Sequence, residues 1–171
     1  MGAAPDAGLL ARLRLLQPVA GELGEAYAGL ARAAVIDPDS AEREFFDLFI
    51  GVGRGEILPY GSYYLTGFLH ERPLAELRGD LARLGIERAE GVPEPEDHIA
   101  FLCETYAGLV ASVFGTGPED AAAFFARHLR PWAGRMFADV EKARPTTFYG
   151  AVGRLGRAAV EIEAAAADLP A

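Results

Sequence analysis

The sequence predicts an all-α fold, formed by a single compact domain of several helices. Leu, Ala, Glu and Arg recur along the chain, whereas Val, Ile and Thr are sparse, and this composition favours helix over strand. Apolar residues repeat at helical spacing, and no segment shows the alternation that is typical of a strand. At 171 residues, the chain lies within the range of about 100 to 200 residues that one domain usually occupies.

Two helices, or one kinked helix, are expected before residue 37. Leucines at helical spacing cover residues 9–16, Pro18 interrupts the pattern, and residues 23–34 resume it until Asp37-Pro38. A proline inside a helix removes a backbone hydrogen bond, so we expect the break at Pro18.

A short, very apolar helix and an irregular loop follow. Asp39 and Glu42 have the spacing of a capping box, and the helix that they begin is expected to end at Gly51. Residues 51–61, GVGRGEILPYG, contain too much Gly and Pro for regular structure. A short helical piece is expected over residues 62–69.

The best internal boundary lies at residues 85–94. A helix over residues 74–84 is stopped by Gly85, and the segment GIERAEGVPE then combines a shift in composition with two turn signals. We expect this segment to be a hinge between an N-terminal helical group, residues 1–84, and a C-terminal group, residues 95–171, of the same domain.

A long amphipathic helix is expected to begin at Pro95. Proline suits the first helical position, and the acids around it complement the positive end of the helix dipole. At 1.5 Å per residue the helix would be roughly 30 Å long. Its apolar face would consist of Ile99, Leu102, Cys103, Tyr106, Leu109, Val110 and Val113. Three more helices are expected at about residues 118–129, 131–143 and 147–167.

Charge and cysteine content exclude several functions. The 25 acidic and 16 basic residues give a net charge of -9, which repels phosphate backbones and anionic lipid surfaces, so we expect no nucleic-acid partner. Cys103 is the only cysteine, which excludes an intramolecular disulfide and a metal site built on paired thiolates. Residues 1–16 lack a basic run followed by an apolar stretch, and no segment is long and apolar enough to span a membrane. These features predict a cytoplasmic protein without a membrane span.

No arrangement of residues predicts catalysis, a cofactor or a metal. His70, His98 and His128 are scattered and lack the i,i+4 partner that would place two imidazoles on one helical face. The glycines at residues 51–55 follow no strand and precede no Gly-Lys-Ser/Thr, so they do not indicate a phosphate-binding loop. A Gly-x-Ser-x-Gly elbow is also absent. We therefore expect a protein that is not an enzyme and that needs no cofactor.

A binding surface is the alternative to a catalytic site. Phe45, Leu48 and Phe49 have the spacing of one helical face, just before the irregular loop that contains the Pro-Tyr pair at residues 59–60. Periodicity alone favours a packed core for the three apolar residues. The Asp-His pair at residues 97–98 is, on the same terms, a helix cap with a neighbouring imidazole.

Several motifs, taken together, resemble the TorD/DmsD family of redox-enzyme maturation chaperones. They occur in the family's order: EFFDLFIG at 44–51, LPYGSYYL at 58–65, PLAELR at 73–78, EPEDH at 94–98, FFARHLRPW at 124–132 and the Phe-Tyr pair at 148–149. The resemblance covers about residues 42–155. The first forty residues match weakly, and nothing is carried over onto them.

The resemblance implies an all-helical chaperone that binds the twin-arginine signal peptide and the apo form of a molybdopterin oxidoreductase subunit, and delays export until the cofactor is inserted. Phe45 and Tyr60 stand where close relatives have Trp, which keeps the apolar role and leaves the client open, with formate dehydrogenase as one candidate. Asp97 would pair with an arginine, and His98, at the positive end of a helix, would stay neutral and act as a hydrogen-bonding or stacking group. Carried over by position, the peptide-binding residues are Phe45, Leu48, Phe49, Pro59, Tyr60, Asp97 and His98.

Two alternatives within this interpretation stay open. One is a NarJ-like assembly chaperone for a respiratory enzyme subunit that is not exported. The other is a version that responds to guanine nucleotide, with weak GTP binding near the glycines at 51–55 and Asp97. The resemblance also predicts a monomer that can form a domain-swapped dimer through residues 85–94.

Overall fold

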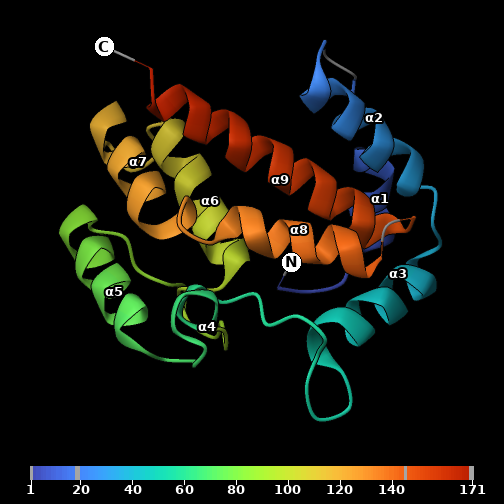
Figure 1. The fold of residues 1–171 in the computed structure, drawn as a ribbon, viewed down its shortest axis with the longest axis horizontal. Helices are drawn as coiled ribbons and strands as arrows, with labels where there is room; N and C mark the ends of the chain where they lie inside the picture. Colours follow the sequence, from blue (N-terminus) through green and yellow to red (C-terminus); the bar gives the residue numbers. More distant parts are fainter. Residues whose placement is uncertain (1, 18–19, 145, 170–171) are drawn as a thin grey trace. The chain divides into compact units, whose positions relative to one another are not determined.

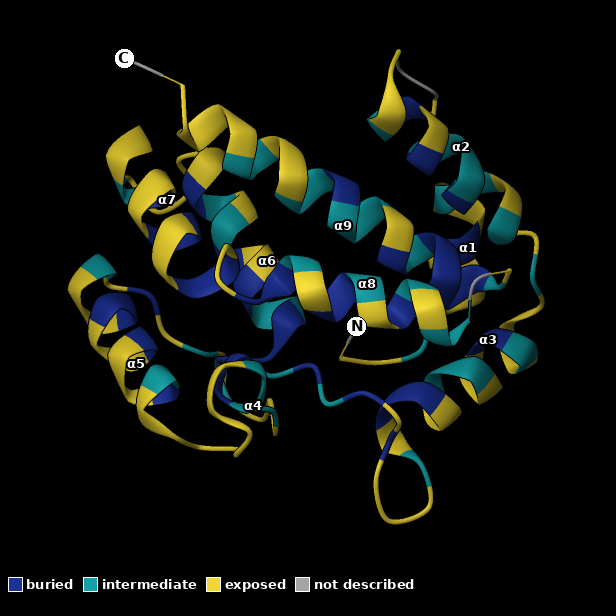
Figure 2. Cartoon of the chain, in the orientation of Figure 1, coloured by how far each residue is buried: buried dark blue, intermediate teal, exposed yellow. Residues whose placement is uncertain are grey.

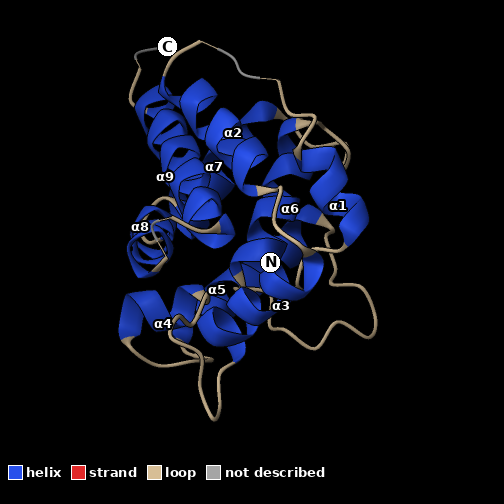
Figure 3. Cartoon of the chain, turned by 90° about the vertical axis from the view of Figure 1, so that its right-hand side faces the viewer, coloured by secondary structure: helices blue, strands red, loops and turns tan. Residues whose placement is uncertain are grey.

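Helices form all the regular secondary structure in residues 2–17, 20–144 and 146–169, the parts of the chain that the computed structural model describes (Figure 1). Loops join them, and Figure 3 shows no strand among these residues. The predicted all-α fold is confirmed. Pro18, where a break was expected, lies outside the described residues.

The helices follow the expected order, with two π-helical segments that the sequence did not predict. They are α1 (Ala7–Leu13), α2 (Glu22–Ala33), α3 (Pro38–Phe45), η1 (Phe46–Ile50), α4 (Gly61–Thr66), α5 (Arg72–Leu84), α6 (Ile99–Val110), α7 (Pro118–Phe124), η2 (Phe125–Leu129), α8 (Ala133–Ala143) and α9 (Phe148–Ala167). As expected, Gly51 ends η1 and Gly85 ends α5.

Two predicted helix starts are wrong. The cap of α3 is Asp37, whose side chain accepts a hydrogen bond from the Ser40 N–H at 2.9 Å, so the cap lies two residues before Asp39 and the helix begins at Pro38. The helix expected from Pro95 begins at Ile99 instead and has 12 residues, which gives a length of about 18 Å. The reason is that the Asp97 carbonyl accepts from the Gly61 N–H and the Ile99 N–H donates to the Pro59 carbonyl, so both groups bond across the chain rather than along a helix.

The far end of α6 also differs from the prediction. Ile99, Leu102 and Leu109 are buried as expected, whereas Val110 and Val113 are 61% and 72% exposed. The helix stops at Val110, and Ser112 follows with a φ of 53°, so the chain leaves the helical path before the expected apolar face is complete.

The segments α3–η1 and α7–η2 repeat one local design. Each begins with a proline in its first turn, Pro38 or Pro118, and each changes from α to π geometry within a Phe-Phe pair. Each π segment ends with a backbone hydrogen bond between residues five positions apart. The Gly51 N–H donates to the Phe46 carbonyl at 2.7 Å, and the Arg130 N–H donates to the Phe125 carbonyl at 2.9 Å. Short π segments inside helices are rare and frequently occur near functional sites.

The chain divides into two compact units. Among the described residues, unit 1 contains residues within 3–58 and 134–165, and unit 2 contains residues within 59–133 and 166–169. The predicted hinge at 85–94 lies within unit 2, and its role as a hinge stays a prediction.

The core of unit 1 is apolar and contains a close helix contact. Leu10, Leu30, Leu48, Met136 and Val140 are almost completely buried, and Figure 2 shows the buried sides of these helices. Helices α8 and α9 approach closely because Gly153 has no side chain: a Cβ there would lie 2.6 Å from the Glu141 amide nitrogen. Glu141 then accepts hydrogen bonds from Arg154 and Arg157 at 3.0 and 3.1 Å.

The core of unit 2 surrounds a single tryptophan. Trp132 is 1% exposed, and its indole N–H donates to the His128 carbonyl at 2.7 Å. The other large apolar side chains that are buried in this unit come mainly from α5, α6, α7 and η2: Leu74, Leu77, Leu81, Ile99, Leu102, Leu109, Phe124, Phe125 and Leu129.

Candidate functional site

Four of the seven predicted site residues meet at a short antiparallel bridge in unit 2. Tyr60 pairs with His98, the Gly61 N–H donates to the Asp97 carbonyl at 2.9 Å, and the Ile99 N–H donates to the Pro59 carbonyl at 2.9 Å. Because α4 begins at Gly61 and α6 at Ile99, the bridge places the N-termini of both helices side by side.

Asp97 is a buried carboxylate with one hydrogen-bonded oxygen and one oxygen that has no partner, which we call the open oxygen. The residue is only 3% exposed, and Oδ2 accepts a hydrogen bond from the Ser62 N–H at 2.8 Å, which caps the first turn of α4. Asp97 Oδ1 and the Ser62 hydroxyl are both buried and have no hydrogen-bond partner among the described residues. Leaving such a group unsatisfied costs about 1 to 3 kcal/mol, and more when it is charged, so each needs an explanation.

His98 directly precedes α6, whereas the expected start at Pro95 would have placed it inside the helix. It is the N-cap of α6, where its Nδ1 accepts a hydrogen bond from the Ala100 N–H at 3.1 Å. Its ring contacts Tyr60 edge to face, with centroids 5.1 Å apart. Burial lowers the pKa of His98 to about 4, so the ring is neutral at pH 7 and carries its proton on Nε2. Burial, with the charges of Glu94 and Asp97, also raises the pKa of Tyr60.

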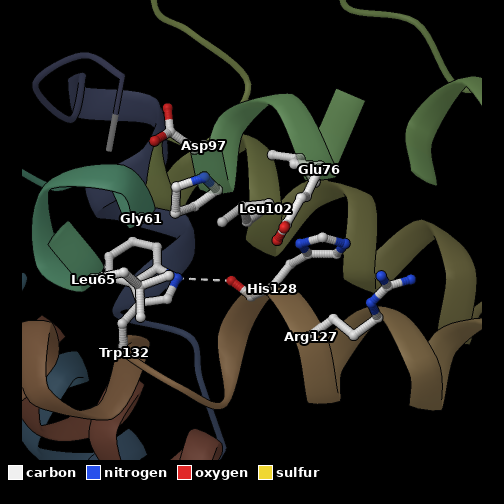
Figure 4. Close-up of a pocket in the computed structure, with 10 residues that line it drawn as sticks. Gly61, Leu65, Glu76, Asp97, Leu102, Arg127, His128 and Trp132 are labelled. Carbon is white, nitrogen blue, oxygen red and sulfur yellow. Dashed lines mark hydrogen bonds between the residues drawn. The ribbon is translucent and has the colours of Figure 1, made fainter. Parts of the chain in front are cut away.

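A small pocket opens beside Asp97 (Figure 4). Its volume is about 70 Å³, enough for several water molecules at about 10 to 15 Å³ each. Gly61, Leu65 and Trp132 lie on one side in Figure 4, and Glu76, His128 and Arg127 lie on the other. A Cβ at Gly61 would approach the Trp132 indole nitrogen to 3.2 Å, so the pocket wall requires a glycine or a shifted indole. Its lining is completed by Pro73, Leu77, Asp97 and Leu102.

A polar cluster that the sequence reasoning missed supports one wall of this pocket. Asp80 on α5 accepts hydrogen bonds from His128 at 2.8 Å and Arg83 at 2.8 Å, and it contacts Arg127 at 2.9 Å. Burial opposes ionisation of Asp80, but the bonds from Arg83 and His128 and the charge of Arg127 together lower its pKa. Burial also lowers the pKa of His128, despite the Asp80 carboxylate. The sequence offered one sign of this cluster, because the polar pair Arg127-His128 lies within the largely apolar segment at 124–132.

The other three predicted residues lie in unit 1. Phe45 and Phe49 form an aromatic cluster with Tyr149 of α9, with centroid distances of 6.2 and 5.3 Å to the tyrosine ring. Leu48 is completely buried and Phe49 is 9% exposed, whereas Phe45 is of intermediate exposure. Burial, together with the charge of Glu44, raises the pKa of Tyr149. These contacts are those of a core, and the peptide-binding role of the three residues stays a prediction.

The described residues give no sign of a metal centre or a membrane segment. No three His, Cys, Asp or Glu side chains among them are grouped so that they could hold a metal ion. Within the same residues, no helix combines the length and the apolar character that crossing a membrane requires.

Comparisons with known proteins give one family. The family model described as nitrate reductase delta subunit matches residues 16–138. The chain is 27% identical over 127 residues to the chaperone protein TorD of Vibrio cholerae, an alignment that covers 69% of this chain and 58% of that protein. It is 32% identical over 79 residues to the protein of the same name from Aliivibrio fischeri, with 45% of this chain and 37% of that one covered. The chain thus spans little more than half the length of the first relative.

Proposed function

The chain belongs to the nitrate reductase delta subunit family, and from this premise we propose that it is a chaperone in the maturation of a molybdopterin oxidoreductase. In this proposal it binds the twin-arginine signal peptide of the client's apo subunit and delays export until the cofactor is inserted. It acts by binding, without catalysis, in the cytoplasm. The name of the curated relatives supports the general role.

The observation that carries the peptide-binding role is the open oxygen of Asp97. A carboxylate oxygen that is buried without a partner gains most from a charged donor, and a guanidinium offers several N–H groups in one plane. The same guanidinium could donate to the unpartnered Ser62 hydroxyl oxygen. We therefore assign the pocket beside Asp97 to one arginine side chain of the client.

The other predicted residues have supporting roles in this proposal. Tyr60 and Pro59 hold the bridge that presents Asp97, and neutral His98 can donate a hydrogen bond from Nε2 to the peptide. In unit 1, Phe45 is the partly exposed member of its cluster and is the candidate there for an apolar contact. Each well-buried apolar side chain contributes about 1.5 to 3 kcal/mol and a peptide can make several such contacts, so apolar contacts should set affinity and the Asp97 carboxylate should set selectivity for arginine.

The proposal is tested by the substitution Asp97→Asn. The amide side chain would keep an oxygen for the Ser62 N–H and remove the charge, so the fold should persist while binding of a synthetic twin-arginine peptide weakens about tenfold, the factor for losing about 1.4 kcal/mol. Isothermal titration calorimetry measures this. Glu94→Gln removes one charge at a less buried position nearby and is the matched control, with a smaller effect expected.

A second peptide tests whether the effect of Asp97→Asn depends on the arginines of the client. When both arginines of the peptide are replaced by glutamine, Asp97→Asn should have no further effect, because the charge that it removes then has no partner. Equal binding of both peptides to the wild-type protein would contradict the arginine assignment. It would favour the NarJ-like alternative, in which the client segment carries no twin-arginine motif.

A further inference from the structure

Leu65 lines the Asp97 pocket, and two more exposed apolar residues follow it within four positions of the chain. Leu65, Phe68 and Leu69, which we name the α4–α5 patch, are 43%, 67% and 39% exposed. We propose that this patch is the docking surface for the apolar stretch of the client peptide that lies next to its arginines. The inference rests on the proposed function and adds to it the position and the direction of the peptide on unit 2.

The loop that carries the patch has a defined shape. Gly67 ends α4 in the left-handed conformation, with φ 84°, and its N–H donates to the Tyr63 carbonyl at 2.8 Å. The Thr66 hydroxyl lies 2.8 Å from the Ser62 carbonyl oxygen and accepts a hydrogen bond from the Phe68 N–H at 3.2 Å. The apolar side chains are therefore presented to solvent by a loop whose backbone is bonded, and a partner would not have to order it first.

A second backbone feature lies at the end of the loop. His70 has a φ of 60°, a region that residues other than glycine adopt at a cost in free energy. The chain then enters α5, whose first turn contains Pro73. Strain of this kind occurs preferentially at ligand-binding segments.

The patch and the pocket share one residue, Leu65. Leu65 belongs to both, since it lines the pocket with Gly61 and Trp132 and is also 43% exposed (Figure 4). Pro73, at the other end of the loop, lines the pocket too. In this proposal, an arginine that reaches Asp97 leaves the next residues of its chain over Leu65, and Phe68 follows three residues later in the loop.

Charge and size favour a cationic peptide over a second copy of this chain. A stable interface usually buries about 800 Å² per partner, which three partly exposed side chains do not approach. Two copies would also each carry a net charge of -9, whereas a peptide with an arginine pair is attracted. Near the patch, Arg72 is paired with Glu76 at 2.7 Å and Arg127 with Asp80 at 2.9 Å, so these two cations are already compensated.

The experiment uses the full chain and a synthetic peptide with an Arg-Arg pair followed by a Leu- and Ala-rich stretch of roughly 12 residues, the length of a signal-peptide apolar region. Phe68→Ser should weaken binding about tenfold, because it removes a large apolar contact, and Phe68→Leu should largely restore it. Val113→Ser is the matched control: this side chain is 72% exposed, is in the same unit and does not line the pocket, so no change is expected. Thermal unfolding of each variant should be unchanged, because all the altered side chains are exposed.

A peptide in which serines replace the leucines completes the design. Phe68→Ser should have no effect on its binding, since the contact partner is gone. If the wild-type protein binds the first peptide, Asp97→Asn weakens it and Phe68→Ser does not, the docking surface is wrong while the proposed function stands. If the wild-type protein binds no peptide, both are overturned. A dimer in light scattering that Phe68→Ser abolishes, with peptide binding intact, would assign the patch to a second copy and also overturn the inference.

Discussion

The two π segments, η1 and η2, have the same backbone geometry, but the side chains that they bury differ in polarity. In η1 the buried side chains are Leu48 and Phe49, which are purely apolar. In η2 they are Phe125, His128 and Leu129, and the imidazole bonds to Asp80 at the wall of a pocket. The same motif of a proline and a Phe-Phe pair therefore accompanies the same backbone in both segments, whereas buried polar groups and open volume distinguish a site from a core.

The largest change in the free energy of unfolding is expected for a substitution at an apolar side chain that η1 buries. Leu48→Ala should lower the free energy of unfolding by about 2 to 5 kcal/mol, because it leaves a cavity in the core of unit 1. Ile50→Ala, in the same π segment at a side chain that is 51% exposed, should cost less than about 1 kcal/mol. Denaturation in urea measures both. Equal losses would show that η1 does not have the buried and exposed sides described.

A smaller effect concerns pH and belongs to unit 2, which contains all three histidines. The pKa of His98 is about 4 in the folded chain and about 6.5 when unfolded, so the unfolded chain binds the proton first as pH falls. Stability should therefore be complete above about pH 6.5 and decline by up to about 3 kcal/mol toward pH 4. The lowered pKa of His128 acts in the same direction.

His98→Asn is the control for this pH dependence. Asparagine is a good N-cap, so it keeps an oxygen for the Ala100 N–H and removes the titration. Urea denaturation repeated from pH 7 to pH 4 should give a shallower decline for this variant. An identical decline in both proteins would mean that His98 is not held neutral by burial.

The smallest change in stability is expected for a substitution in the polar cluster that η2 forms with Asp80. Asp80→Asn keeps an acceptor for His128 and loses the charge that pairs with Arg83 and Arg127. Because both arginines are more than half exposed, the cost should be about 1 kcal/mol. Asp47→Asn, at an exposed acid of η1, should change stability by less than about 0.5 kcal/mol. If both substitutions were neutral, the polar cluster would contribute nothing measurable to unit 2.

Sequence patterns predicted the fold class and most helices because apolar periodicity and glycine stops are local signals. The TorD-type resemblance is likewise confirmed, by the family and relatives that the chain matches. The start of α6 could not be predicted, since it depends on hydrogen bonds between residues 59–61 and 97–99, far apart in the sequence. The π segments were missed for a related reason: one extra residue in a turn leaves the apolar pattern almost unchanged over so short a stretch.

The candidate site was predictable only in part. The motif EPEDH drew attention to Asp97 and His98, but nothing local indicated that one carboxylate oxygen would cap α4 and the other would stay open. Asp80 was missed because its partners, Arg127 and His128, lie almost fifty residues away. Long-range polar contacts of this kind leave no periodic trace in a sequence.

The π turn of η2 has a consequence for how such a protein can change over evolution. A π turn contains about one residue more than an α turn, so it is equivalent to a single inserted codon, and every later side chain is rotated by about 100° around the helix axis. Removing one residue from the segment 125–129 would restore an ordinary helix and turn Trp132 away from Gly61, while the sequences of α4, α5 and α6 stay the same. Single insertions and deletions at this point could therefore open, close or reshape the pocket in different lineages while the surrounding fold is inherited intact.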